Sequence, residues 1–467
     1  MRAHRWLPAA LGPLLLALTA CDAVSPGDSA GDTRPNLILV SFDSLRADHL
    51  GTYGYHRDTS PNLDRFAAES VLFERAYSTS SWTLPAHASM LSSLYPEEHG
   101  ASSARKALGD EVVLLPETLA AAGYRSRAIV SVGLLHRVFG FAQGWEAYDD
   151  ATAVPAGEED PERRRTSAVV GRRAAEFLDA LAPGPFFLFV HDYDVHFDYQ
   201  PPPPYDTLFE PAHVPDFDPS NYAFNDTIHR DMPRAHLERL IALYDGEIRW
   251  VDHNFGLLMA ELERRGLADN TVVAVVGDHG EEFFEHGEKG HQNNLFNTSL
   301  QVPMIVRFPD GEHAGRRVEA PVSLVDLAPT LAAAAGVAPD PSWAGIDIAT
   351  LVENNTAHGP ARWLHAELMA RSGHAQRAAI FGRKKGLARF GARGHVPGRA
   401  GLYDVVADPE ERNPLHDSTA GRARLQAMIA RMEHEVSGFR QTNARLGSGW
   451  VKLDAERAAE LRALGYL

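Results

Sequence analysis

The sequence predicts an α/β fold built on a doubly wound, mostly parallel sheet, because fully apolar runs alternate with helical patterns. The runs 36–42, 186–190 and 271–276 are continuously apolar, which is typical of parallel strands buried on both faces. A weaker run covers 302–306, where Pro303 is tolerable only near a strand start. From His236 to Arg265, apolar residues recur at near-helical spacing. This alternation favours an open α/β sheet with helices on its faces.

The C-terminal part of the sequence has a different pattern. Short apolar runs at 378–381, 385–390 and 402–406 predict antiparallel strands, and a helix is expected near 422–436. We therefore predict a large α/β domain over residues 35–350 and a smaller α+β subdomain over residues 351–467.

The N-terminus has the pattern of a secretory signal peptide over residues 1–21. A basic start precedes an apolar stretch that is too short to span a membrane, and Leu18-Thr19-Ala20-Cys21 follows. This ending is similar to a bacterial lipobox, which implies cleavage before Cys21 and its lipidation; the alternative is an ordinary signal peptide. Residues 22–34 are expected to form a flexible tether. The protein is thus expected outside the cytoplasm, anchored by lipid to a bacterial membrane and facing the periplasm or cell exterior.

Cysteine content and net charge argue against a disulfide-stabilised protein and against a nucleic-acid-binding protein. Cys21 is the single cysteine, so an intramolecular disulfide is impossible. The formal net charge of −17 argues against nucleic acid as a partner. An acidic protein can still act on an anionic ester if a metal and local cations mask its charge.

Polar side chains gather where the three apolar runs end. Since ligands of open α/β sheets bind beyond the carboxyl ends of the strands, these residues are expected to share one site. They are Asp43 after the first run, His191, Asp192, Asp194 and His196 after the second, and Asp278 and His279 after the third.

The segment Trp82-Thr83-Leu84-Pro85-Ala86-His87 predicts a reactive alcohol at a helix start. Thr83 stands just before an expected helix whose first turn carries a proline, and His87 follows one turn later on the same face. The helix start favours anions. A nucleophile, an anion site and an imidazole would therefore converge.

A metal site is expected from Asp43, Asp278 and His279 with the Thr83 oxygen. Carboxylate and imidazole donors suit one divalent ion among Mn, Zn, Ca and Mg. Gly280 would allow a close backbone approach to this site. The alternative is that the acids cap the helices that follow each strand.

These motifs together resemble the sulfatase branch of the alkaline phosphatase superfamily. The stretch from Pro35 to about Asp347 is similar to its catalytic domain, and the run 402–413 is similar to its C-terminal subdomain. The resemblance implies that Asp43, Asp278 and His279 bind metal and that Thr83 is the nucleophile. Ser44 stands where many sulfatases have a second aspartate.

Threonine at the nucleophile position departs from the family's Cys/Ser-x-Pro-x-Arg signature. Sulfatases oxidise that cysteine or serine to formylglycine, whereas the β-carbon of Thr83 carries a methyl group, so no formylglycine is expected. A threonine alkoxide can attack phosphorus and form a phosphothreonine that water hydrolyses. The sequence therefore favours phosphate mono- or diesters over sulfate esters.

The resemblance also implies roles for the other polar residues. His87 replaces the family arginine, His196 matches a histidine that contacts the anion or protonates the leaving group, and His291 stands where a lysine lies beside the substrate. Lys289 is the second candidate for that position. Arg46 is a candidate to pair with Asp48 or with substrate, and His191 is expected only to support its loop.

Three other functions remain open from the sequence. The chain is alternatively a sulfuric ester hydrolase, a transferase that moves a phospho-headgroup to an alcohol, or a binding lipoprotein that lost turnover. Substrate and oligomeric state do not follow from the sequence.

Overall fold

The computed structural model describes residues 32–151, 166–180, 184–209, 214, 217–353, 359–369, 374–391, 394–453 and 455–463. The chain divides into a unit over Met1–Thr33 and a unit over Arg34–Leu467, and the second is described below. Cys21 and the tether to residue 31 lie outside the described residues, and the boundary at residue 350 stays a prediction. In the described residues, no helix combines the length and the apolar character needed to cross a bilayer.

A mixed sheet forms the centre of the fold, and its five adjacent strands β8, β1, β7, β5 and β6 are parallel. Its spatial order is β13 (Arg317–Val318), β2 (Val71–Phe73), β12 (Met304–Arg307), β8 (Thr271–Gly277), β1 (Asn36–Phe42), β7 (Phe186–Asp192), β5 (Arg125–Ile129) and β6 (Ala147–Asp149). The α/β fold class with a mostly parallel sheet is confirmed.

The fourth apolar run does not form one parallel strand. It divides at Pro303 into β11 (Gln301–Val302), which pairs with β3 (Ala76–Tyr77), and β12, which runs antiparallel to β8. Proline has no amide hydrogen for a ladder bond, so the chain changes sheets there.

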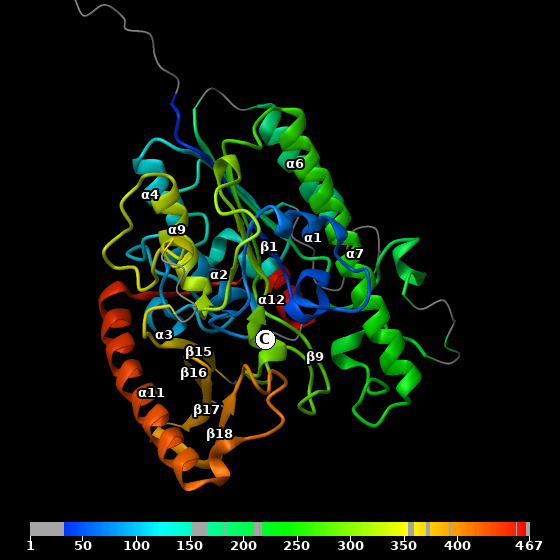
Figure 1. Ribbon diagram of the computed structural model, residues 1–467, viewed down its shortest axis with the longest axis vertical. Coiled ribbons are helices and arrows are strands. Elements are labelled where there is room, and N and C mark those ends of the chain that lie inside the picture. Colours follow the sequence, from blue (N-terminus) through cyan, green and yellow to red (C-terminus); the bar gives the residue numbers. More distant parts are fainter. Residues whose placement is uncertain are drawn as a thin grey trace, which may run out of the picture. The chain divides into compact units, whose positions relative to one another are not determined.

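Helices cover both faces of the central sheet (Figure 1). Alternate side chains of β1 point to opposite faces, so Ile38 and Val40 join one apolar cluster while Leu37 and Leu39 join the other. The first cluster is closed by α1 (Pro61–Ala68), α6 (Ser167–Asp179) and α7 (Arg234–Arg264); the second by α2 (Thr83–Ser92), α4 (Leu115–Ala121) and α9 (Leu327–Ala334). The continuous apolar runs are explained by burial on both sides.

The C-terminal part forms a four-stranded antiparallel sheet with α11 (Thr419–Leu446) along it (Figure 1). The strands are β15 (Leu364–Met369), β16 (Ala375–Phe381), β17 (Lys384–Gly391) and β18 (Gly394–Asp404). Leu425, Met428 and Met432 recur at helical spacing and pack on the sheet. The helix is longer than the predicted 422–436 at both ends. At its start, the Ser418 hydroxyl caps the helix by accepting from Gly421 N at 2.9 Å.

A buried ion pair joins this sheet to loops of the larger domain. Lys385 of β17 is fully buried, and its Nζ lies 3.0 Å from Glu411 and 2.9 Å from Asn297 Oδ1. Asn297 begins α8 (Asn297–Leu300), which follows the segment that carries His291. The position of that segment therefore depends on the C-terminal sheet.

Candidate active site

Three adjacent parallel strands bring the expected residues to one edge of the sheet. Register places Ser41 of β1 beside His191 of β7, and Phe42 beside Gly277 of β8. Asp43 N donates to Asp192 O at 2.9 Å, and Asp278 N donates to Phe42 O at 3.2 Å. The residues after β1 and β8 therefore lie side by side, as the sequence predicts.

Thr83 lies at the first residue of α2, one position further into the helix than expected, with Trp82 as the N-cap. Its buried hydroxyl oxygen is 3.5 Å from Asp43 Oδ2 and 3.4 Å from His279 Nε2. One turn later, His87 Nδ1 donates to Thr83 O at 2.9 Å. The Thr83 hydroxyl at the start of α2 therefore lies close to the residues that follow β1 and β8.

The side chains of Asp43, Asp278 and His279 are arranged as a metal site requires. His279 Nε2 lies 3.5 Å from Asp43 Oδ1 and 3.5 Å from Asp278 Oδ2. Ligands about 2.1 Å from one ion in tetrahedral geometry lie roughly 3.4 Å apart. Asp278 Oδ1 accepts from Ser44 N and His279 N, whereas its buried Oδ2 has no hydrogen-bond partner among the described residues. A divalent cation fits this donor set, with Thr83 as a fourth ligand.

The electrostatics of the site also favour a bound cation. Burial raises the pKa of Asp43, and burial together with the neighbouring Asp43 charge raises the pKa of Asp278 well above its usual range. Burial lowers the pKa of His279 to about 3, so its imidazole is neutral at pH 7, the form that binds metal. Two buried carboxylates beside a neutral imidazole leave negative charge that a cation would balance.

Two residues shape the backbone around these ligands. Ser44, with a left-handed φ of 56°, donates its hydroxyl to Asp43 Oδ1 at 3.0 Å, so it orients a carboxylate. Gly280 is required for a different reason than expected. A Cβ there would overlap the backbone oxygen of Thr298, so the close approach is to the segment around α8.

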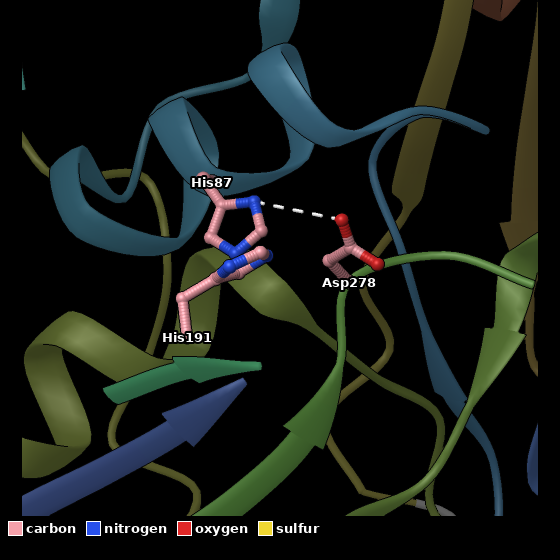
Figure 2. Close-up of side chains that lie close together, drawn as sticks. All are labelled: His87, His191 and Asp278. Atoms are coloured by element: carbon pink, nitrogen blue, oxygen red, sulfur yellow. Dashed lines mark ion pairs between the residues drawn. The ribbon is translucent and has the colours of Figure 1, made fainter. Parts of the chain in front are cut away.

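His191 was expected only to support its loop, but it faces the site. Its ring is fully buried, and its Nε2 lies 3.5 Å from Asp43 Oδ2. The His191 and His87 ring centroids are 4.9 Å apart, and the two rings lie against each other beside Asp278 (Figure 2). The pairing of Ser41 with His191 across β1 and β7 is the signal that would have found this residue.

His291 lies next to His279, and His196 lies next to His291. His291 follows a small hairpin of β9 (Glu282–Phe283) and β10 (Lys289–Gly290). Its ring centroid is 4.5 Å from that of His279 and 4.9 Å from that of His196. His196 Nδ1 is 2.8 Å from the hydroxyl of Tyr193, which fixes its ring. Both predicted histidines therefore belong to the same cluster of side chains as His279.

The two cations considered as substrate contacts have protein partners instead. The buried Arg46 guanidinium bonds to Asp48 at 2.7 Å and Glu285 at 2.5 Å, which agrees with the predicted Asp48 pair. Lys289 Nζ donates to the backbone oxygens of Tyr222 and Asn225 at 2.8 and 2.9 Å. Of the two candidates from the hairpin, His291 and not Lys289 lies against a ligand of the metal site.

Comparison with known families agrees with this geometry. The model of the sulfatase family matches residues 35–337, and that of the N-sulphoglucosamine sulphohydrolase C-terminal domain matches residues 285–441. These matches confirm the predicted resemblance and cover both sheets.

Curated relatives and solved structures extend over most of the chain. An N-acetylglucosamine-6-O-sulfatase of Bacteroides thetaiotaomicron is 23% identical, over 92% of this chain and 91% of its own. An arylsulfatase of Clostridium perfringens is 24% identical, over 88% and 97%.

Two solved structures share the fold. One, in complex with its substrate D-glucosamine-2-N,6-O-disulfate, has a TM-score of 0.71 at 18% identity and covers 88% of this chain and 99% of its own. The phosphonate monoester hydrolase of Agrobacterium radiobacter has a TM-score of 0.69 at 20% identity, with coverage of 89% and 96%.

Proposed function

Because the chain belongs to the sulfatase family, we propose that it is a metal-dependent hydrolase that cleaves an anionic ester through the Thr83 hydroxyl. The observation that carries this proposal is the position of Thr83 Oγ1, 3.5 Å from Asp43 Oδ2 and 3.4 Å from His279 Nε2. A divalent ion held by Asp43, Asp278 and His279 would supply positive charge to an alcohol and to an anion.

We favour a phosphorus ester as the substrate, because threonine cannot form the aldehyde on which family sulfatases depend. In the first step, Thr83 Oγ1 bonds to phosphorus, the bond from phosphorus to the ester oxygen breaks, and the Thr83 proton is transferred to that oxygen, which leaves as the alcohol. In the second, water attacks phosphorus and the bond to Oγ1 breaks, which restores the hydroxyl and releases the phosphorus acid. A sulfated threonine would be harder to hydrolyse by this route.

The histidines beyond His279 are suited to the leaving group. The leaving ester oxygen needs a proton or a hydrogen bond, and we assign its contact to His196 and His291, whose ring centroids are 4.9 Å apart. Burial lowers the pKa of His291 to about 4, so its ring is neutral at pH 7 and would donate a hydrogen bond from N–H instead of acting as an imidazolium acid. His87, whose pKa burial lowers well below its usual value, is neutral and orients Thr83 through the helix backbone. It therefore does not replace the charge of the family arginine.

A sulfuric ester hydrolase is the second candidate function. The names of the relatives favour it, since the curated proteins matched over most of this chain include an N-acetylglucosamine-6-O-sulfatase and an arylsulfatase. It would require sulfate transfer through Thr83, or direct attack of water without formylglycine.

A parallel assay separates the two candidates. Metal-loaded protein is given an aryl phosphate monoester, diester, phosphonate and sulfate. We expect turnover of a phosphorus ester that Thr83→Ala lowers by at least about 10³-fold. Thr79→Ala is the matched control, because the buried Thr79 Oγ1 has no hydrogen-bond partner among the described residues and lies off the helix. Turnover of the sulfate alone would exclude the phosphorus preference, and full activity of Thr83→Ala would exclude the nucleophile.

We also propose that the protein is a lipoprotein held at a bacterial membrane through Cys21. The Leu-Thr-Ala-Cys sequence after a short apolar stretch supports this proposal. Mass spectrometry of the mature N-terminus should find diacylglycerol on Cys21, and Cys21→Ala should release the protein from membranes. An unmodified N-terminus at another residue would contradict the anchor.

A further inference from the structure

The expected positive side chains do not reach Thr83. Arg46 is bonded to Asp48 and Glu285, and Lys289 is bonded to backbone oxygens of another loop. His87 stands where an arginine would supply a charge. Positive charge for an anion beside Thr83 therefore has to come largely from bound metal.

His191 presents an unshared electron pair to a carboxylate. Ser131 Oγ donates its single proton to His191 O at 2.7 Å, so at 3.2 Å it can only accept from His191 Nδ1–H. Nε2 then carries no proton, yet it lies 3.5 Å from Asp43 Oδ2 and makes no hydrogen bond within the described part of the chain. A lone pair and a carboxylate that face each other in a fully buried place repel, unless a proton or a metal cation lies between them.

His87 and the carboxylate of Asp278 lie beside His191 and Asp43. His87, His191 and Asp278 each offer a ligand atom within 4.8 Å of the others (Figure 2). His87 Nδ1 is 3.6 Å from Asp278 Oδ2, the buried oxygen that accepts no hydrogen bond from any residue that the structure describes. His87 Nε2 is 2.9 Å from Ser41 Oγ, which can accept the proton when Nδ1 turns its lone pair to a metal. The bond from Nδ1 to Thr83 O, through which His87 orients Thr83 when this position holds no ion, would then be replaced by the bond to the ion.

We propose that the chain binds a second divalent cation between His191, His87 and the carboxylates of Asp43 and Asp278. This inference rests on the proposed function only for the first ion, at Asp43, Asp278 and His279. Asp43 then bridges two ions, since Oδ1 faces His279 while Oδ2 faces His191. Two imidazoles make the second site one for Mn²⁺ or Zn²⁺ in preference to Ca²⁺ or Mg²⁺. The second ion supplies the charge that His87 lacks.

Metal stoichiometry and electron paramagnetic resonance with Mn²⁺ test this site without recourse to activity. The metal-free wild type should take up about two Mn²⁺ ions and show the spectrum of an exchange-coupled pair, because bridging carboxylates place the ions close together. His191→Gln should bind about one ion with an uncoupled spectrum. His99→Gln is the matched control, since His99 is also fully buried but contacts Ser89 outside the ligand groups, and it should keep both ions.

The outcomes distinguish the second site from the proposed function. A wild type that binds one ion without coupling overturns the second site, and so does a His191→Gln variant that keeps a coupled pair. In either case the function stands if turnover still needs Thr83. Binding of no ion overturns both. The wild-type spectrum alone shows whether a second, coupled ion is bound, even if His191→Gln fails to fold.

Discussion

The effect of Asp278→Asn on thermal stability should depend on metal. The variant should be at least as stable as the wild type without metal and less stable than the wild type with metal. In the wild type, Asp278 Oδ1 accepts from Ser44 N at 3.0 Å and His279 N at 2.7 Å, and an asparagine oxygen can keep both bonds. The variant removes one negative charge from a buried pair, because Asp43 lies beside it. Without metal, the variant should therefore unfold at the same temperature as the wild type or at a higher one.

With metal, the wild type should gain stability that the variant lacks. A ligand at one hundred times its dissociation constant stabilises the native state by about 2.7 kcal/mol. For a unit of the size of Arg34–Leu467, the entropy of unfolding is roughly 0.9 kcal/mol per degree, so each ion should raise Tm by about 3 °C. Asp278→Asn should lose this increment because its amide nitrogen cannot replace the ligand oxygen.

Differential scanning calorimetry in EDTA and in saturating Mn²⁺ measures both effects. Asp252→Asn is the control: this buried carboxylate on α7 accepts from Asn62 N and Leu63 N and lies outside the ligand groups. It should lower Tm equally in both conditions and leave the metal increment unchanged. A wild type whose Tm does not respond to metal, or an Asp278→Asn variant with the full increment, would refute the assignment of the ligand.

The remaining predictions concern the fold around the site. Burial lowers the pKa of His99 to about 3 from 6.5, so below pH 6.5 the unfolded chain binds more protons than the folded one, and the free energy of unfolding falls as pH decreases toward 3. Near pH 5, His99→Gln should reduce the slope of the free energy of unfolding against pH by about 1.4 kcal/mol per pH unit, as measured by urea titrations. Lys385→Met leaves Glu411 buried without its partner and should cost about 3–5 kcal/mol, whereas adding Glu411→Leu should recover much of this loss. Gly280→Ala should displace the backbone at Thr298 and weaken Mn²⁺ binding measured by calorimetric titration, and unchanged binding would contradict that role.

The sequence predicts best what depends on local pattern. Strands β1 and β8 and helix α7 lie within two residues of their predicted bounds, because apolar runs and helical spacing reflect burial directly. The sequence predicts Asp43, Asp278 and His279 as one group because they follow the ends of two apolar runs, and these runs form the adjacent parallel strands β1 and β8.

What the sequence could not supply depends on register and on partners distant in the chain. His191 was assigned to loop support because its approach to Asp43 follows from the pairing of β7 with β1, which one strand alone does not reveal. The sequence allows Arg46 to pair with Asp48 or with substrate, because its other partner, Glu285, comes from a loop more than two hundred residues later. The partner of Gly280 is likewise a backbone oxygen of a later segment.

The central claim is that Thr83 carries the transferred group, and the most direct measurement is the mass of the peptide containing Thr83 after acid quench during turnover of an aryl phosphate. We predict that this peptide gains one phosphoryl group in the wild type, that the group maps to Thr83, and that Thr83→Ala gains none and turns over no substrate. An unmodified Thr83 peptide under steady turnover, together with activity that persists in Thr83→Ala, would contradict the covalent mechanism.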